Sequence, residues 1–168
     1  MIRIAITGPE SSGKTTLSQS LAEYLNVVFI PEYARSYLEK TNGRYNQSDL
    51  DLIAKGQLES ISAPQNKIII CDTDFSVLEI WSQYKYGSVS DSIQSIVEQN
   101  LFDLHILCTP DIPWEEDSLR ENPVNRDQLF ELYKESLNRH NKKFIIVTGE
   151  HKNRIEKSLH SIDRLLKL

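Results

Sequence analysis

The sequence predicts an α/β protein of three layers, in which a five-stranded parallel sheet is covered by helices on both faces. Five short, continuous apolar runs recur along the chain, and amphipathic helical patterns separate them. Strands that are buried on both faces of a parallel sheet have this continuous apolar character, and crossover helices alternate with them. A chain of 168 residues, 39% hydrophobic and 26% charged, fits one domain with a sizeable core. We therefore expect a single domain over residues 1–168.

The elements of the first half are separated by residues that end strands and helices. Pro31 ends the second apolar run, and the Asn-Gly pair at 42–43 marks a turn. Asn46 or Ser48 can cap the helix that follows, and Pro64 ends that helix. The predicted elements are strands at 2–7 and 26–30 and helices at 14–25, 32–40 and about 48–61.

In the second half, apolar runs and helical faces alternate in the same way. Gly87 ends one predicted helix, and a stretch rich in proline and acid follows the fourth strand. The last helix places Ile155, Leu159 and Ile162 on one face, which is the pattern of a helix packed against a sheet. The predicted elements are strands at 67–71, 104–108 and 144–147 and helices at 75–86, 91–100, 125–141 and 152–166.

The carboxyl ends of the five strands are expected to form one cleft. In open α/β sheets, ligands bind outside these strand ends. A glycine-containing loop follows the first strand, and polar residues follow each of the others. These are Glu32, then Asp72 with Asp74, then Asp111, and finally Thr148-Gly149.

Residues 8–15 carry the strongest motif, G-P-E-S-S-G-K-T, which matches the P-loop pattern G-x-x-x-x-G-K-[ST]. A predicted strand precedes it and a predicted helix follows it, which is the context that the motif requires. Gly8 and Gly13 let the backbone approach a ligand, and successive N–H groups cradle a polyphosphate at the helix N-terminus. Lys14 is expected to reach the β- and γ-phosphates. The predicted ATP-binding residues are Gly8, Pro9, Glu10, Ser11, Ser12, Gly13, Lys14, Thr15, Thr16, Thr148 and Gly149.

Two groups are predicted to serve a metal ion. The hydroxyl of Thr15 is expected to sit on Mg²⁺. Asp72 ends an apolar strand, where a carboxylate can bind the Mg²⁺ of MgATP directly or through water. Asp72 could instead cap the helix that begins near Phe75, and the residues alone leave both roles open.

Glu32 and Asp74 are the candidates for orienting or deprotonating an acceptor hydroxyl. Both follow strand ends, and a general base must lie within reach of the proton that it takes. Glu32 could alternatively be a surface residue in the first turn of a helix, where the helix dipole favours a negative charge.

Three arginines are placed near this cleft. Arg35 lies three residues after Glu32, so it could bind an anionic group of the acceptor or form an ion pair that holds Glu32 in place. Arg120 and Arg126 lie in a lid predicted near 109–126, where guanidinium groups would stabilise the charge on a transferred phosphoryl group. The alternative role for these two arginines is to neutralise the acidic run in the same segment.

Aromatic side chains could line the acceptor pocket. Trp81 and Tyr84 lie three residues apart on the helix after Asp74, and Trp114 lies in the Pro-rich segment. Stacking on a flat heterocycle uses such rings, and a cationic ring gains further from a π face. Packing in the core is the alternative for all of them.

Composition and charge exclude several classes of function. The net charge is −5 with no basic block, so we expect no nucleic-acid partner. The apolar start is strand-length and carries Arg3, which fits neither a signal peptide nor a membrane span. Cys71 and Cys108 are interpreted as core thiols of a reducing compartment. These features predict a cytoplasmic protein with no membrane partner, and they give no indication of its oligomeric state.

Four sequence blocks together resemble a known family. They are G-P-E-S-S-G-K-T-T-L, P-E-Y-A-R-x-Y-L, D-T-D before W-x-x-Y-x-Y-G, and L-C-T-P-D-I-P-W-E-x-D-x-L-R. They are similar to the ribosylnicotinamide kinase domain of the bifunctional bacterial NAD-biosynthesis regulator, over residues 1 to about 166. In that family a nucleotidyltransferase domain precedes this domain. We expect it to be absent here and carry over no adenylyl transfer.

The resemblance implies a P-loop kinase fold and an ATP-dependent kinase that phosphorylates the 5′-hydroxyl of nicotinamide riboside, a small-molecule riboside, with Mg²⁺. It also implies that Asp72 and Asp74 serve the metal and the acceptor, that Glu32 and Arg35 face the acceptor, and that Trp114 and Arg120 belong to the lid. The expected catalytic residues are Lys14, Glu32, Asp74, Arg120 and Arg126, and the expected substrate-binding residues are Glu32, Tyr33, Arg35, Asp74, Trp81, Tyr84 and Trp114.

Alternative functions remain open at this stage. The acceptor could be another nucleoside or a small alcohol. A P-loop ATPase or regulatory nucleotide switch with a protein partner is the other class. A GTPase-like switch is disfavoured because the stretch at 141–144, N-K-K-F, is not the guanine-reading N-K-x-D pattern. The choice between ATP and GTP is not fixed by the sequence.

Overall fold

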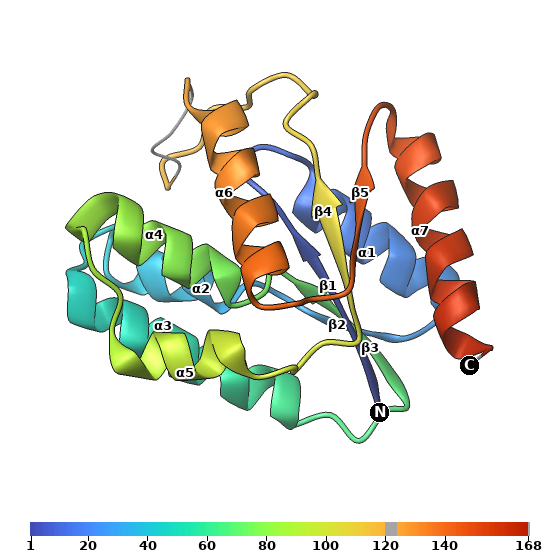
Figure 1. The fold of residues 1–168 in the computed structure, drawn as a ribbon, viewed down its shortest axis with the longest axis horizontal. Helices are drawn as coiled ribbons and strands as arrows, with labels where there is room; N and C mark the ends of the chain where they lie inside the picture. The colour runs from blue at the N-terminus through green and yellow to red at the C-terminus, as the bar shows by residue number, and fades with distance from the viewer. Residues whose placement is uncertain (120–123, 168) are drawn as a thin grey trace.

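One parallel sheet of five strands forms the centre of the molecule (Figure 1). The computed structural model describes residues 1–119 and 124–167. The strand order is β2-β3-β1-β4-β5, and every neighbouring pair is parallel. This confirms the fold class and the sheet that the sequence predicts. The strands are β1 (Ile2–Thr7), β2 (Val28–Ile30), β3 (Ile68–Asp72), β4 (Leu104–Cys108) and β5 (Phe144–Val147).

Helices cover both faces of the sheet (Figure 1). α1 (Lys14–Leu25) and α7 (His151–Leu166) pack on one face, where Leu17, Leu21 and Ile162 meet side chains of β1 and β4. The helices on the other face form two adjoining apolar clusters. They are α2 (Tyr33–Lys40), α3 (Gln47–Ser62), α4 (Ser76–Tyr86), α5 (Asp91–Glu98) and α6 (Arg126–Arg139).

Local signals in the sequence explain where several helices begin and end. Asn46, one of the two expected caps, caps α3 in a capping box with Asp49. The hydroxyl of Ser90 accepts a hydrogen bond from the N–H of Ile93 at the start of α5. Gly87 takes the left-handed conformation that ends α4, with φ of 71°.

The start of α2 is fixed against α3 by one close contact. A Cβ built on Gly56 would lie 2.2 Å from the ring of Tyr33, so only glycine lets this ring pack here. The side chain of Gln57 accepts a hydrogen bond of 2.7 Å from the N–H of Tyr33. Because Glu32 immediately precedes Tyr33, these contacts also set the position of Glu32.

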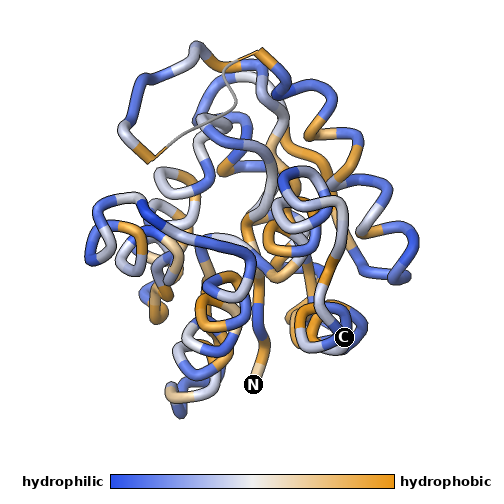
Figure 2. Tube along the Cα trace, turned by 90° about the vertical axis from the view of Figure 1, so that its left-hand side faces the viewer, coloured by the Kyte–Doolittle hydropathy of each residue, from blue (hydrophilic) through white to orange (hydrophobic). Residues whose placement is uncertain are grey.

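Residues 109–119, which follow β4, contact the P-loop through Glu115 and α2 through Asp117. Figure 2 shows this loop, up to the grey trace, as mostly hydrophilic. It corresponds to the predicted lid near 109–126. Within residues 1–119 and 124–167, no helix has the length and apolar character to cross a membrane.

Candidate active site

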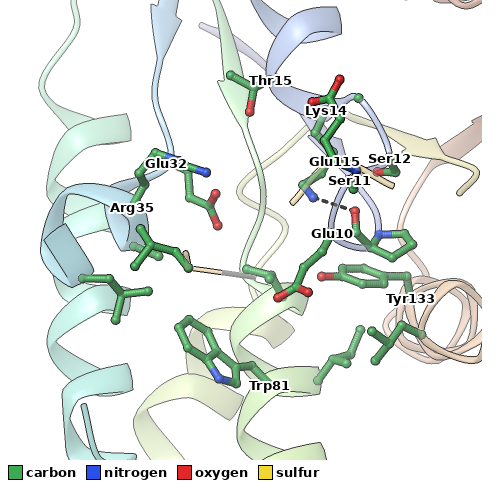
Figure 3. A pocket seen from close by; sticks show the side chains of 18 of the residues that line it. Glu10, Ser11, Ser12, Lys14, Thr15, Glu32, Arg35, Trp81, Glu115 and Tyr133 are labelled. Atoms are coloured by element: carbon green, nitrogen blue, oxygen red, sulfur yellow. Dashed lines mark hydrogen bonds between the residues drawn. The ribbon is translucent and has the colours of Figure 1, made fainter. Parts of the chain in front are cut away.

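A cavity of about 390 Å³ opens at the carboxyl end of the sheet. Its walls come from the P-loop, the start of α2, one face of α4, the loop at 112–119 and α6. Figure 3 shows Lys14 and Thr15 on one side, Glu32 across from them, and Trp81 and Tyr133 at the far end. The expected convergence of strand ends on one cleft therefore holds for the P-loop and for Glu32.

The backbone of the P-loop has the conformations that its glycines allow. Gly8 has φ of 135°, and a Cβ at this position would lie 2.6 Å from the carbonyl oxygen of Cys108. Gly13 has φ of 80° and Ser11 has φ of 51°, so two left-handed residues flank Ser12. Alternation of this kind turns successive amides toward one point, which is how backbone anion sites are built.

The side chains of the loop lie as a phosphate site requires. The ammonium of Lys14 donates a hydrogen bond of 2.9 Å to the carbonyl of Pro9, at the loop that a phosphate would fill. The hydroxyl of Ser12 is buried and has no hydrogen-bond partner among the described residues. Thr16 lines the cavity. Figure 3 shows the Glu10 side chain reaching toward the half of the cavity that holds Trp81 and Tyr133.

Thr148 and Gly149 do not line the cavity within the described residues. The hydroxyl of Thr148 and the N–H of Gly149 both donate to Oδ2 of Asp111, each at 2.6 Å. These hydrogen bonds, with one from Thr109 and the charge of Arg154, overcome the cost of desolvation and lower the pKa of Asp111 to about 2. The two groups that we expected to contact the nucleotide are therefore engaged by a carboxylate of the same chain.

Thr15 and Asp72 form the pair that a hydrated Mg²⁺ would meet. The hydroxyl of Thr15 donates a hydrogen bond of 2.6 Å to Oδ2 of Asp72. Asp72 is 2% exposed, and its Oδ1 atom has no hydrogen-bond partner among residues 1–119 and 124–167. Burial raises the pKa of Asp72, although Thr15 and Lys14 act in the opposite direction. A buried carboxylate oxygen without a partner, beside a hydroxyl, fits the oxygen ligands of Mg²⁺.

Among the described residues no group of three or more His, Cys, Asp or Glu side chains could hold a metal ion. Mg²⁺ in phosphoryl-transfer sites usually takes one or two carboxylates, water and the phosphates of the substrate. Thr15 and Asp72 are the residues that would contribute to such a set.

Asp74, in contrast, does not face the cavity. It is 3% exposed, and its Oδ1 atom accepts hydrogen bonds from the hydroxyls of Thr7 at 2.7 Å and Ser76 at 2.6 Å. Its Oδ2 atom lies 3.4 Å from Nε2 of His105, which is also buried. The sequence prediction that Asp74 orients or deprotonates the acceptor does not agree with this position, because an interior carboxylate with these partners cannot meet an acceptor hydroxyl.

The backbone at Thr73 explains why two carboxylates two residues apart diverge. Side chains at i and i+2 of a strand point to the same face. Asp72 pairs in register with Ile6, whose side chain packs on the α1 face. Thr73 then takes φ of 79°, which breaks the alternation. Asp74 consequently meets Thr7 on the opposite face of the sheet.

Glu32 is the carboxylate that faces the P-loop across the cavity. It follows β2 and precedes the first residue of α2. Figure 3 shows its carboxylate directed into the space in front of Lys14 and Thr15. Burial raises the pKa of Glu32, the charge of Lys14 opposes this shift, and the charge of Asp72 adds to it. A carboxylate with a raised pKa, opposite a phosphate site, is suited to accept a proton from a hydroxyl.

The structure gives Arg35 a partner that the sequence analysis did not consider. Its guanidinium donates a hydrogen bond of 2.9 Å to the carboxylate of Asp117, in the loop that follows β4. Arg35 also lines the cavity. The contact joins the start of α2 to the predicted lid.

The four predicted aromatic residues divide into two groups. Trp81 and Tyr84 line the cavity, and the indole N–H of Trp81 donates a hydrogen bond of 2.9 Å to the hydroxyl of Tyr45. Trp114 and Tyr33 are outside the described lining. The Trp114 ring lies 5.8 Å from the guanidinium carbon of Arg126, and the Tyr33 ring packs on α3. The structure thus favours packing roles for these two.

The two predicted lid arginines cannot be treated together. Arg120 lies outside the described residues. Arg126 is the first residue of α6, and its guanidinium donates hydrogen bonds of 3.0 Å to the carbonyls of Ser11 and Ile112. Arg126 is therefore bound to the P-loop backbone, and it is not among the described residues that line the cavity.

Sequence reasoning missed several residues at this site, among them Tyr133, Tyr45 and Arg154. Tyr133 and Tyr45 line the cavity but belong to a helix face and a turn that carry no distinguishing pattern. Arg154 is 3% exposed and donates a hydrogen bond of 2.7 Å to the carbonyl of Ser12. Its signal was available, since Arg154 precedes buried Ser158 and Ile162 by four and eight residues on α7. A charged residue on a buried helix face needs a partner.

The fold and the loop at 8–15 define the class of protein, a P-loop α/β protein with the fold of the P-loop kinases. The chain belongs to a family described as AAA domain, whose model matches residues 3–154.

Two relatives confirm the resemblance to the NAD-biosynthesis regulator. The chain is 33% identical over 156 residues to the trifunctional NAD biosynthesis/regulator protein NadR of Escherichia coli K12. That match covers 88% of this chain and 38% of NadR. The corresponding protein of Salmonella typhimurium LT2 is also 33% identical, over 86% of this chain and 37% of its own length. The chain thus spans less than half the length of these relatives.

Solved structures agree on the fold. A crystal structure of NadR in complex with NR superposes with a TM-score of 0.80 at 23% identity, covering 97% of this chain and 49% of that one. Thymidylate kinase from Ehrlichia chaffeensis superposes with a TM-score of 0.66 at 20% identity, covering 96% of this chain and 98% of that one.

Proposed function

We propose that this protein is an ATP-dependent kinase that transfers the γ-phosphate to the 5′-hydroxyl of nicotinamide riboside. One observation carries the proposal. Glu32 lies across the cavity from the P-loop residues Lys14 and Thr15, and the cavity continues from there to Trp81. A donor site, a proton acceptor and an aromatic pocket thus share one enclosed space.

We propose a task for each of these parts. The amides of residues 8–15 and the ammonium of Lys14 bind and orient the phosphates. The acceptor hydroxyl gives its proton to the Glu32 carboxylate as its oxygen bonds to the γ-phosphorus. The bond from that phosphorus to the β-γ bridging oxygen breaks, and ADP leaves. Trp81, supported by Tyr45, offers a ring face to the base of the riboside, and a cationic base gains from such a face.

Thr15 and Asp72 would hold the Mg²⁺ ion. When it is bound, this ion supplies charge neutralisation for the phosphates of the donor. Asp72 keeps one oxygen free of hydrogen bonds for this purpose among the described residues. The hydroxyl of Thr15 orients the other oxygen.

The known relatives support the same reading. NadR of E. coli is named as a trifunctional NAD biosynthesis/regulator protein. Crystal structures of NadR proteins contain NR in one case, and NAD with AMP-PNP in another. We carry over only the kinase reaction, because this chain matches 38% of the E. coli protein. We further propose that residues 1–168 act as one kinase domain, and that it works in the cytoplasm, where ATP is available and where its two thiols, both free and buried, stay reduced.

Incubation with MgATP and a panel of ribosides tests the proposal. ADP is expected to form only when a riboside is present, fastest with nicotinamide riboside, and mass spectrometry should find one added phosphoryl group on it. Nicotinamide riboside without its 5′-hydroxyl is the matched control, because it fills the pocket but offers no attacking oxygen. ADP release that ignores every riboside would contradict a kinase. Faster turnover of a different nucleoside would keep the kinase and replace the acceptor.

A further inference from the structure

Two consecutive carbonyl groups of the P-loop are each held by an arginine from a different helix. Arg126, at the start of α6, donates from Nη1 to the carbonyl of Ser11 at 3.0 Å. Arg154, on α7, donates from Nη1 to the carbonyl of Ser12 at 2.7 Å. The two helices lie on opposite faces of the sheet (Figure 1). The P-loop backbone is therefore hydrogen-bonded by helices from both faces of the sheet.

Elementary peptide geometry gives these contacts a consequence. In a planar trans peptide, the carbonyl of one residue and the N–H of the next point in opposite directions. A guanidinium that holds the carbonyl of Ser11 outward thus turns the N–H of Ser12 the other way. The contact on the carbonyl of Ser12 does the same for the N–H of Gly13. These are two of the amides that a P-loop offers to phosphate.

The loop needs such support because its backbone is not in a relaxed conformation. Ser11 has φ of 51°, in the left-handed region that disfavours residues with a Cβ. Such conformations persist only where the surroundings enforce them. Arg126 donates its hydrogen bond to the carbonyl of this same residue, Ser11.

Arg154 is anchored so that it cannot turn away. It is 3% exposed and also donates to the carbonyls of Gly149 at 2.8 Å and Thr109 at 3.2 Å. The Nη2 atom, which donates to Thr109, is also paired with the carboxylate of Asp111. Since Asp111 offsets the positive charge, we assign the effect of Arg154 to geometry and not to added attraction for phosphate. Asp111 also accepts the hydrogen bonds from Thr148 and Gly149.

Arg126 links the loop to the predicted lid. The same Nη1 atom that contacts Ser11 also donates to the carbonyl of Ile112, and the guanidinium lies over the ring of Trp114. The hydroxyl of Ser11 in turn accepts a hydrogen bond of 2.9 Å from the N–H of Glu115. The residues that hold Ser11 thus come from the lid segment and from the helix that follows it.

We propose that Arg126 and Arg154 are positioning residues that fix the peptide planes presenting the N–H groups of Ser12 and Gly13 to the phosphates of the nucleotide. The proposal rests on the proposed function in that the loop must bind a polyphosphate. Neither arginine touches the acceptor half of the cavity among the described residues. The loss of either guanidinium therefore weakens binding of the nucleotide phosphates and leaves binding of the riboside unchanged.

Calorimetric binding of tripolyphosphate and of ADP to the full chain tests this. Arg126→Met and Arg154→Lys should each weaken tripolyphosphate binding about tenfold, the equivalent of one lost hydrogen bond that orders the site. The KM for the riboside should stay within about twofold, while the KM for ATP rises with the tripolyphosphate Kd. Arg164→Met, at an exposed arginine of the same helix α7, is the matched control and should bind like the wild type.

Several outcomes would overturn the proposal. Variants that bind tripolyphosphate as tightly as the wild type, at unchanged melting temperature, exclude a positioning role. An equal loss for tripolyphosphate and riboside indicates general loosening and also overturns it. If Arg154→Lys unfolds, the partly exposed Arg126 still decides the outcome through Arg126→Met and Arg126→Lys. Failure of the wild type to bind tripolyphosphate would instead refute the proposed function.

Discussion

The two halves of the cavity are built in different ways. The donor half is a run of eight consecutive residues whose backbone forms the binding surface, and its strongest constraints are φ angles and one glycine contact. The acceptor half is made of side chains from α2, α4, α6 and the loop at 112–119. A backbone site depends on local sequence, whereas a side-chain site depends on how distant elements pack. A substitution in the acceptor half should therefore change one side-chain contact and leave the rest of the cavity in place.

Glu32→Gln should have the largest effect and should separate the two halves most clearly. Removing a general base lowers turnover by about 10²- to 10⁴-fold, while the Kd for ADP stays near that of the wild type, because Glu32 belongs to the acceptor side. Steady-state kinetics and calorimetry measure the two quantities. Glu39→Gln, at an exposed position of the same helix, is the control. Unchanged turnover in Glu32→Gln would remove Glu32 from the mechanism.

The raised pKa of Glu32 adds a pH dependence with a defined sign. The base works when ionised, so turnover should fall as the pH drops through the raised pKa, above the ordinary range of a glutamate. A folded-state pKa above the unfolded value gives stability that is complete below the unfolded pKa and is lost as the pH rises through the folded pKa. Glu32→Gln should therefore melt at a higher temperature than the wild type at neutral pH. It should lose this advantage in acid.

Trp81→Leu should have an intermediate effect confined to the acceptor. Loss of the ring face is expected to raise the KM for the riboside about tenfold, in the range of a stacking or cation–π contact. The KM for ATP should change little. Tyr24→Leu is the control, since Tyr24 is an exposed aromatic residue on α1. If the two KM values rise together, the indole supports the whole cavity and not the acceptor alone.

Asp74→Asn should have the smallest effect on turnover and tests the separation of the two aspartates. The variant keeps one oxygen that can accept from Thr7 and Ser76, but it loses the charge and the oxygen that faces His105, which should lower the free energy of unfolding by about 1–3 kcal/mol. Turnover of the folded enzyme should stay within about threefold. Asp72→Asn is the comparison, and its activity should depend more steeply on the Mg²⁺ concentration. A loss of turnover in Asp74→Asn as deep as that of Glu32→Gln would restore Asp74 to the active site.

The sequence was sufficient to predict the helices and strands and the backbone loop at 8–15 for a physical reason. Continuous apolar runs and helical faces identify all five strands and the helices to within a few residues, and the P-loop needs only its own eight residues. The position of Asp74 was mispredicted because a single φ angle at Thr73 sends it to the other face of the sheet. Thr148 and Gly149 donate hydrogen bonds to Asp111, and no local sequence pattern predicts this contact between two loops.

The packing of Tyr33 on Gly56 makes the α2 side of the cavity a fixed wall. A ring pressed against a helix backbone leaves α2 no room to shift toward α3, so Glu32 keeps its place whatever enters the cavity. We expect any adjustment to a bound acceptor to come from the other walls of the cavity. Acceptors that are extended away from Glu32 should accordingly be tolerated better than acceptors that are extended beside the attacking hydroxyl.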